Sequence, residues 1–125
     1  MRVLVCGGRD FCDGRAVTEV LGPLHRHKPF TAVIHGGAKG ADGLAGAWAR
    51  WMSVPEIVYQ ADWESNSRAA GPMRNQKMLD EGKPDLVVAF PGGRGTADMV
   101  RRARRAGVPV VAAMVPSQRQ SEEKP

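Results

Sequence analysis

Three Gly-Gly pairs in this chain have the composition expected of anion-binding turns. The pairs are Gly7-Gly8, Gly36-Gly37 and Gly92-Gly93, and each follows a short apolar run typical of a β-strand. Glycine adopts positive φ at little cost, and without a Cβ it lets backbone N–H groups approach an anion closely. We therefore predict that all three turns line a phosphate-binding site. Tight turns that bind no ligand are the alternative.

The segment from Pro91 to Thr96 shows this chemistry most fully. It leads from a strand into a helix, whose first N–H groups and positive dipole end favour a phosphate. Thr96, the expected N-cap, adds a hydroxyl donor. The predicted phosphate ligands in this segment are Gly92, Gly93, Arg94, Gly95 and Thr96.

Polar side chains gather near the same turns. The candidate ligand-binding residues among them are Arg9, Lys39, Asp42, Arg74 and Asn75. Arg74 offers a planar fork for phosphate or carboxylate, and Asp42 suits a ribose hydroxyl. The alternatives are a surface charge for Arg74 and a helix N-cap for Asp42. His35 is expected to be a satisfied strand-end histidine, and Trp63 either covers the ligand or only packs.

Apolar runs rich in β-branched residues alternate with amphipathic segments of helical length, which predicts an α/β fold. Strands are expected at Arg2 to Cys6, Thr31 to His35, Glu56 to Tyr59, Asp85 to Phe90 and Val108 to Ala112. Helices are expected at Gly14 to His27, Gly40 to Met52, Pro72 to Glu81 and Thr96 to Ala106. Right-handed crossovers then give a Rossmann-like, doubly wound parallel sheet of five strands in the order 3-2-1-4-5, with helices on both faces.

This topology brings the glycine turns together. They follow the carboxyl ends of parallel strands, and ligands bind at that edge where the strand order reverses, here between the first and fourth strands. A chain of 125 residues fits one domain, expected at residues 1–115, with a polar, disordered tail at 116–125. No apolar run is long enough for a membrane span, so we expect a cytoplasmic protein with no membrane partner.

The charge of the chain favours an anionic partner. The net charge is +5, and much of the excess lies in the arginines at positions 101, 102, 104 and 105 of one expected helix. A solvated helix face explains this cluster more simply than a nucleic-acid patch, because no aromatic residue lies among the arginines to stack bases. No cofactor is expected, and the spacing of the two cysteines, Cys6 and Cys12, indicates no metal site.

Four strings in the chain resemble a known family. They are VCGGRDF, VIHGGAKGAD, AGPMRNQKML and VVAFPGGRGTADM, and in this order they resemble the YspA-type branch of the SLOG superfamily. Its members are Rossmann-like proteins related to the Lonely guy phosphoribohydrolases and to DNA-processing protein A. The resemblance implies that the chain binds a nucleotide or nucleotide-derived ligand. It also implies a homodimer or higher oligomer, for which the apolar Trp51 offers contact area.

One residue of the chain differs from the catalytic motif of the related enzymes. Lonely guy enzymes cleave the N-glycosidic bond of a nucleoside monophosphate with a PGGxGTxxE motif, and its glutamate serves the ribose and catalysis. Residues 91–96 match this motif, but Met99 stands where the glutamate would be. A methionine cannot stabilise an oxocarbenium ion or activate water.

Several functions therefore stay open. In an N-glycosidase, Asp42 or Asp98 would supply the missing carboxylate, and Asp42 is preferred because Asp98 points about 100° away from Met99 around the helix. In a non-catalytic sensor or sequestering protein, the phosphate site would bind a nucleotide-derived signal without converting it. Binding of single-stranded DNA by the arginine helix is the weakest of the three.

Overall fold

The strands form one parallel sheet in a computed structural model that describes residues 1–113. They are β1 (Arg2–Cys6), β2 (Ala32–His35), β3 (Glu56–Val58), β4 (Leu86–Ala89) and β5 (Val110–Ala112). Their order is β3-β2-β1-β4-β5, and every neighbouring pair is parallel. The predicted α/β class and the strand order 3-2-1-4-5 are confirmed. The disordered tail predicted at 116–125 lies outside the described residues.

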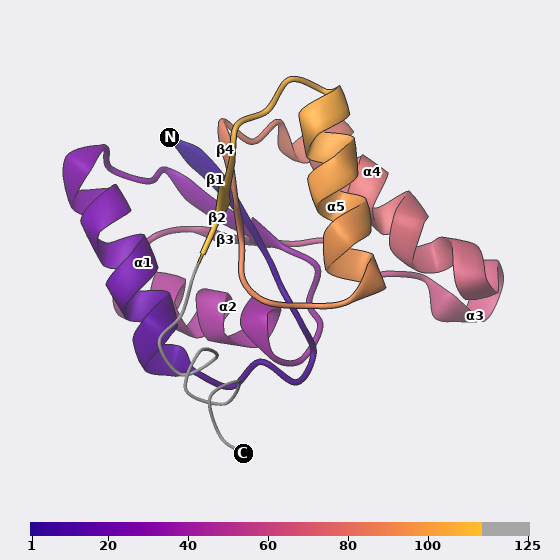
Figure 1. The fold of residues 1–125 in the computed structure, drawn as a ribbon, viewed down its shortest axis with the longest axis horizontal. Helices are drawn as coiled ribbons and strands as arrows, with labels where there is room; N and C mark the ends of the chain where they lie inside the picture. The colour runs from indigo at the N-terminus through magenta and orange to yellow at the C-terminus, as the bar shows by residue number, and fades with distance from the viewer. Residues whose placement is uncertain (114–125) are drawn as a thin grey trace, which may run out of the picture.

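Helices cover both faces of this sheet (Figure 1). They are α1 (Gly14–His27), α2 (Ala41–Trp51), α3 (Trp63–Asn66), α4 (Ala70–Gly82) and α5 (Arg94–Arg105), with a short 3₁₀ helix η1 (Ser67–Ala69) between α3 and α4. Helices α1 and α2 lie on one side of the sheet, and α4 and α5 lie on the other. Within residues 1–113, no helix is long and apolar enough to cross a membrane.

The central strand β1 explains this layering. Successive side chains of a strand point to opposite faces, so a strand buried on both faces must be apolar throughout. Val3 and Val5 belong to the core cluster packed under α1 and α2. Leu4 and Cys6 belong to the second cluster, which α4 and α5 cover. All four residues are buried, and β1 therefore lies at the centre of the sheet.

The start of α5 differs from the sequence prediction. The helix begins at Arg94 with Gly93 as its N-cap, so Thr96 is its third residue and not the cap. Glycine at position 93 caps the helix without a side-chain hydrogen bond, which a search for Ser, Thr, Asp or Asn misses. The consequence is that the predicted phosphate loop forms the first turn of the helix.

The segment before α4 is also more helical than predicted. Helix α4 begins at Ala70, so Pro72 lies in its third position, where a missing N–H still costs no helical hydrogen bond. Helix α3 was not predicted, because one turn shows no hydrophobic period. Its N-cap is Asp62, whose side chain accepts a hydrogen bond from the backbone N–H of Ser65 over 3.1 Å.

Candidate functional site

A cleft of about 1300 Å³ opens where β1 and β4 lie side by side, at the point where the strand order reverses. It lies at the carboxyl ends of the strands, as ligand sites in this type of sheet do. All the residues predicted for ligand binding or catalysis line it. They are Gly7, Gly8, Arg9, Gly36, Gly37, Lys39, Asp42, Arg74, Asn75, Gly92, Gly93, Arg94, Gly95, Thr96 and Asp98.

Two of the glycine turns are pressed together at the floor of this cleft. The backbone N–H of Gly8 donates to the carbonyl oxygen of Pro91 over 2.8 Å. A Cβ on Gly8 would lie 2.9 Å from that oxygen, and a Cβ on Gly92 would lie 2.6 Å from the Gly8 nitrogen. Close packing of the two turns therefore explains glycine at positions 8 and 92 without any ligand.

The turn after β2 uses its own N–H groups internally. The backbone N–H groups of Gly36 and Ala38 both donate to Oδ2 of Asp42, each over 3.2 Å. The N–H of Gly37 donates to Nδ1 of His35 over 3.0 Å. These three donors are occupied, so this turn does not offer the backbone anion cradle that its glycines suggested. Asp42 closes the turn, whereas the N-cap of α2 is Gly40.

His35 is a buried, fully partnered histidine at the end of β2. Because its Nδ1 accepts the Gly37 hydrogen, its proton lies on Nε2, which donates to Oε2 of Glu56 over 2.6 Å. This hydrogen bond from His35, with help from Arg50, holds the pKa of Glu56 below its ordinary value although partial burial opposes the shift. His35 thus positions the Gly37 turn and has no ring nitrogen left for a ligand.

The start of α5 offers backbone donors for which no acceptor is found among residues 1–113. The first turn of an α-helix leaves its N–H groups without partners inside the helix, and here these belong to Gly93, Arg94, Gly95 and Thr96. A Cβ on Gly93 or Gly95 would meet no atom within 4 Å, and neither residue has positive φ. Neither packing nor a positive φ therefore requires glycine at these two positions.

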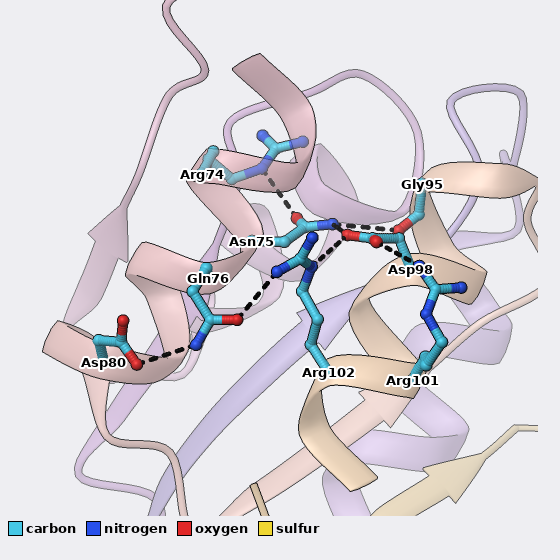
Figure 2. Close-up of polar contacts among 8 residues, drawn as sticks. All are labelled: Arg74, Asn75, Gln76, Asp80, Gly95, Asp98, Arg101 and Arg102. Atoms are coloured by element: carbon cyan, nitrogen blue, oxygen red, sulfur yellow. Dashed lines mark hydrogen bonds and ion pairs between the residues drawn. The ribbon is translucent and has the colours of Figure 1, made fainter. Parts of the chain in front are cut away.

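Hydrogen bonds between α4 and α5 hold this first turn in place (Figure 2). The side-chain Nδ2 of Asn75 donates to the carbonyl oxygen of Gly95 over 3.2 Å and to Asp98 over 3.0 Å. Arg101 and Arg102 donate to the same carboxylate over 2.6 and 2.8 Å. Two arginines of the predicted solvated cluster therefore pair with Asp98, and of these Arg102 is half-buried, whereas Arg101 is exposed like Arg104 and Arg105.

The two carboxylates proposed for catalysis have different surroundings. Burial raises the pKa of Asp98, but hydrogen bonds from Asn75 and Arg102 and the charges of both arginines outweigh it, so its pKa lies below the ordinary value. Burial raises the pKa of Asp42 above its ordinary value, although the backbone hydrogen bonds from Ala38 and Gly36 and the charge of Arg74 oppose the rise. Asp98 is thus an ion-paired anion, and Asp42 is the carboxylate whose proton affinity is raised.

Met99 does not face the cleft. Its side chain is 1% exposed and packs in the core cluster with Cys6 and Met78. Cys6 lies at the cleft floor, where burial and the nearby Asp42 charge raise the pKa of its thiol to about 12 and keep it protonated. The position of the missing glutamate therefore belongs to the core of this chain.

Sequence reasoning missed several residues of the cleft. Gln60, Arg68 and Arg101 line it. Trp63, which was expected either to cover the ligand or only to pack, also lines the cleft and is 57% exposed. Arg68 lies in η1, which has no sequence signature, and Arg101 looked like part of a solvated face. The cationic residues that line the cleft are Arg9, Lys39, Arg68, Arg74, Arg94 and Arg101. The acidic residues that line it are fewer, namely Asp10, Asp42 and Asp98. The cleft is therefore basic and suits an anion.

The chain is similar to known proteins in sequence and in fold. A model of the family described as "YspA, cpYpsA-related SLOG family" matches residues 1–65. The Gene 61 protein of Mycobacterium phage D29 is 41% identical over 118 residues, which cover 88% of this chain and 94% of that protein. DNA processing protein A (DprA) from Streptococcus pneumoniae has a similar structure, with a TM-score of 0.52 and 17% identity. That match covers 99% of this chain but 62% of the DprA chain, and it shows a shared fold.

Proposed function

The chain belongs to the YspA, cpYpsA-related SLOG family. We propose that it binds a nucleotide or nucleotide-derived ligand by a phosphate at the start of α5. The open space at Gly93 and Gly95 carries this proposal, because glycine there serves neither packing nor positive φ. An anion that approaches the backbone closely gives the missing reason. Arg94 and the Thr96 hydroxyl complete the anchor.

The exposed ring of Trp63 supplies a surface for the rest of the ligand. It lines the same cleft and lies against the start of α4, where a Cβ on Gly71 would be 3.4 Å from the ring atom Cη2. Aromatic faces stack any nucleobase, and a stack of this kind contributes about 1 to 3 kcal/mol. A base on Trp63 and a phosphate on residues 91–96 would span the cleft.

Binding without turnover is the form of this function that the geometry favours. Met99 is in the core, and Asp98 already accepts hydrogen bonds from three side chains. Neither residue replaces the glutamate of the related enzymes. A sensor or sequestering protein needs only the phosphate anchor at the start of α5 and the Trp63 ring on which the nucleobase stacks.

Cleavage of an N-glycosidic bond is the second candidate, and Asp42 is the observation that favours it. Its carboxyl lies in the cleft with a raised pKa, which is typical of general acids and bases. If this candidate holds, free base accumulates with the wild type, and the rate falls at least about a hundredfold in Asp42→Asn.

A panel of nucleoside mono-, di- and triphosphates, ADP-ribose and cyclic nucleotides tests both candidates. Thermal shift reports binding, and chromatography of the same samples reports products. We expect a shift of several degrees with no product. Thr96→Val should reduce the shift, whereas the matched Thr18→Val on α1 should not, because Thr18 is exposed outside the cleft. If no phosphate compound changes the melting temperature, the proposed function is wrong.

Single-stranded DNA is a weaker candidate, supported by the exposed Arg104 and Arg105 at the end of the helix whose first turn lines the basic cleft. The structural neighbour is named for DNA processing, but α5 has no aromatic residue among its arginines. Binding of this kind would weaken steeply as salt rises. A nucleotide anchored by one phosphate would show a much shallower salt dependence.

Self-association is a further proposal. Trp51, at the end of α2, is 86% exposed, whereas Trp48 in the same helix is buried. An exposed tryptophan favours a contact surface and supports the predicted homodimer or higher oligomer. Light scattering of the wild type and of Trp51→Ser tests this, and a wild-type mass of 13.5 kDa would contradict it.

A further inference from the structure

Arg74 is a cationic side chain of the cleft that has only neutral partners. It is half-buried, its Nη1 donates to the carbonyl oxygen of Gly36 over 2.8 Å, and its Nε donates to the side-chain oxygen of Asn75 over 3.0 Å. Within residues 1–113, no carboxylate forms an ion pair with it. Asp42 lies close enough to act on it electrostatically but does not pair with it.

A half-buried guanidinium that forms no ion pair is unfavourable, because burial removes hydration that neutral oxygens only partly replace. Burial lowers the pKa of Arg74, in agreement with this picture, although the Asp42 charge opposes the shift. An anionic ligand group in the cleft would supply the missing opposite charge. The planar fork of arginine matches a phosphate group well.

Helix α4 places Arg74 between the two ends of the proposed ligand site. Gly71, Arg74 and Asn75 lie at positions i, i+3 and i+4, so they share one face of the helix. Trp63 lies against Gly71, and Asn75 holds the carbonyl oxygen of Gly95. Arg74 follows Gly71 by about 4.5 Å along the axis and directly precedes Asn75.

We infer that the ligand is a nucleotide with a diphosphate, whose terminal phosphate binds residues 91–96 and whose inner phosphate binds Arg74. This inference depends on the proposed function, because it assumes the phosphate anchor at α5. A base on Trp63 would lead through the sugar and the inner phosphate to the terminal phosphate. Arg74 donates to the Asn75 side chain, and that side chain donates to the carbonyl oxygen of Gly95, so one side chain links Arg74 to the first turn of α5. The two phosphates of a diphosphate share one oxygen, so a ligand that reaches both groups needs two phosphates placed close together.

Matched pairs of nucleoside mono- and diphosphates test the inference by isothermal titration. The wild type should bind the diphosphate at least about tenfold more tightly than the monophosphate of the same base. Arg74→Gln, which removes the charge, should bring this ratio close to one. Arg74→Lys keeps the charge without the planar fork and should retain part of the ratio. The control Arg15→Gln removes an exposed arginine on α1 and should leave the ratio unchanged.

Two results would overturn the inference while the phosphate anchor stands. The first is that the wild type binds mono- and diphosphates equally tightly. The second is that Arg74→Gln keeps the same preference for the diphosphate as the wild type. Circular dichroism checks that the variants are folded. If Arg74→Gln is unfolded, Arg74→Lys tests the inference, and its preference for the diphosphate should be smaller than that of the wild type. If no nucleotide binds the wild type, the proposed function itself fails, and this inference fails with it.

Discussion

The side chain of Asn75 donates a hydrogen bond to the carbonyl oxygen of Gly95, so a buried residue of α4 fixes the first turn of α5 (Figure 2). The same side chain accepts a hydrogen bond from Arg74, which in turn reaches the Gly36 carbonyl. One chain of contacts therefore joins the turn after β2 to the proposed phosphate anchor. A site held in this way loses little conformational freedom when a ligand binds.

Removing the Asn75 side chain should weaken both the fold and the anchor. In Asn75→Ala, the buried Asp98 and the Arg74 Nε each lose a hydrogen-bond partner, and we expect a loss of about 2 kcal/mol in the free energy of unfolding. Urea denaturation measures it. The neighbouring Gln76→Ala is the control and should cost about 1 kcal/mol or less, because its partners Arg102 and Asp80 reach water and stay solvated when the Gln76 hydrogen bonds are lost. Equal losses in the two variants would contradict a special role for Asn75.

Gly95→Ala should separate stability from ligand binding. An added Cβ meets no atom of the protein, and alanine suits a helix better than glycine, so the free protein should gain about 0.5 to 1 kcal/mol. The thermal shift caused by nucleotides should fall, because the Cβ would occupy space proposed for the phosphate. Gly43→Ala, in the first turn of α2, is the matched control with a similar gain and an unchanged shift. A nucleotide shift in Gly95→Ala as large as in the wild type would argue against the anchor.

Restoring the glutamate of the related enzymes should not create activity. The Met99 side chain is 1% exposed, so Met99→Glu would bury a carboxyl among apolar side chains and cost about 3 kcal/mol or more. Met99→Leu keeps the volume and should cost less than about 1.5 kcal/mol. Thermal unfolding compares the two variants, and nucleotide products are assayed alongside. A stable, active Met99→Glu protein would show that this position reaches the cleft.

The pH dependence of stability should report the ion pairs of Asp98. Its pKa in the folded protein lies below the ordinary value of 3.8, so the ionised form stabilises the fold above that pH. This contribution is lost as the pH falls through the folded-state pKa. The difference in unfolding free energy between the wild type and Asp98→Asn should therefore be constant near pH 7 and shrink below about pH 4. A difference that grows on acidification would contradict the assigned pairs.

The sequence predicted the order of the strands and most residues that line the cleft, because both follow from the apolar runs and the handedness of the crossovers. Strands such as Arg2–Cys6 are buried on both faces, so they read as continuous apolar runs, and right-handed crossovers leave few possible orders. The glycine turns then had to meet at one edge. Helix α3 and η1 escaped prediction because their few residues depend on the local cap at Asp62 and not on a hydrophobic period.

The role of each glycine could not be predicted from the sequence. Gly8 and Gly92 are explained by two backbones in contact, whereas Gly93 and Gly95 face open space. All four look identical in a sequence motif, because the difference depends on segments that lie far apart in the chain. The three Gly-Gly turns were predicted to act alike, but only the structure shows that the N–H groups of Gly36 and Gly37 are already occupied.

Amide chemical shifts in a nucleotide titration test the central claim most directly. We predict that the largest phosphate-dependent shifts, compared with the matching nucleoside, fall on the N–H groups of Gly93, Arg94, Gly95 and Thr96. The N–H groups of Gly36, Gly37 and Ala38 serve as internal controls, because they donate within the protein and should move less. Largest shifts on residues 36–38, or outside the cleft, would contradict a phosphate anchor at the start of α5.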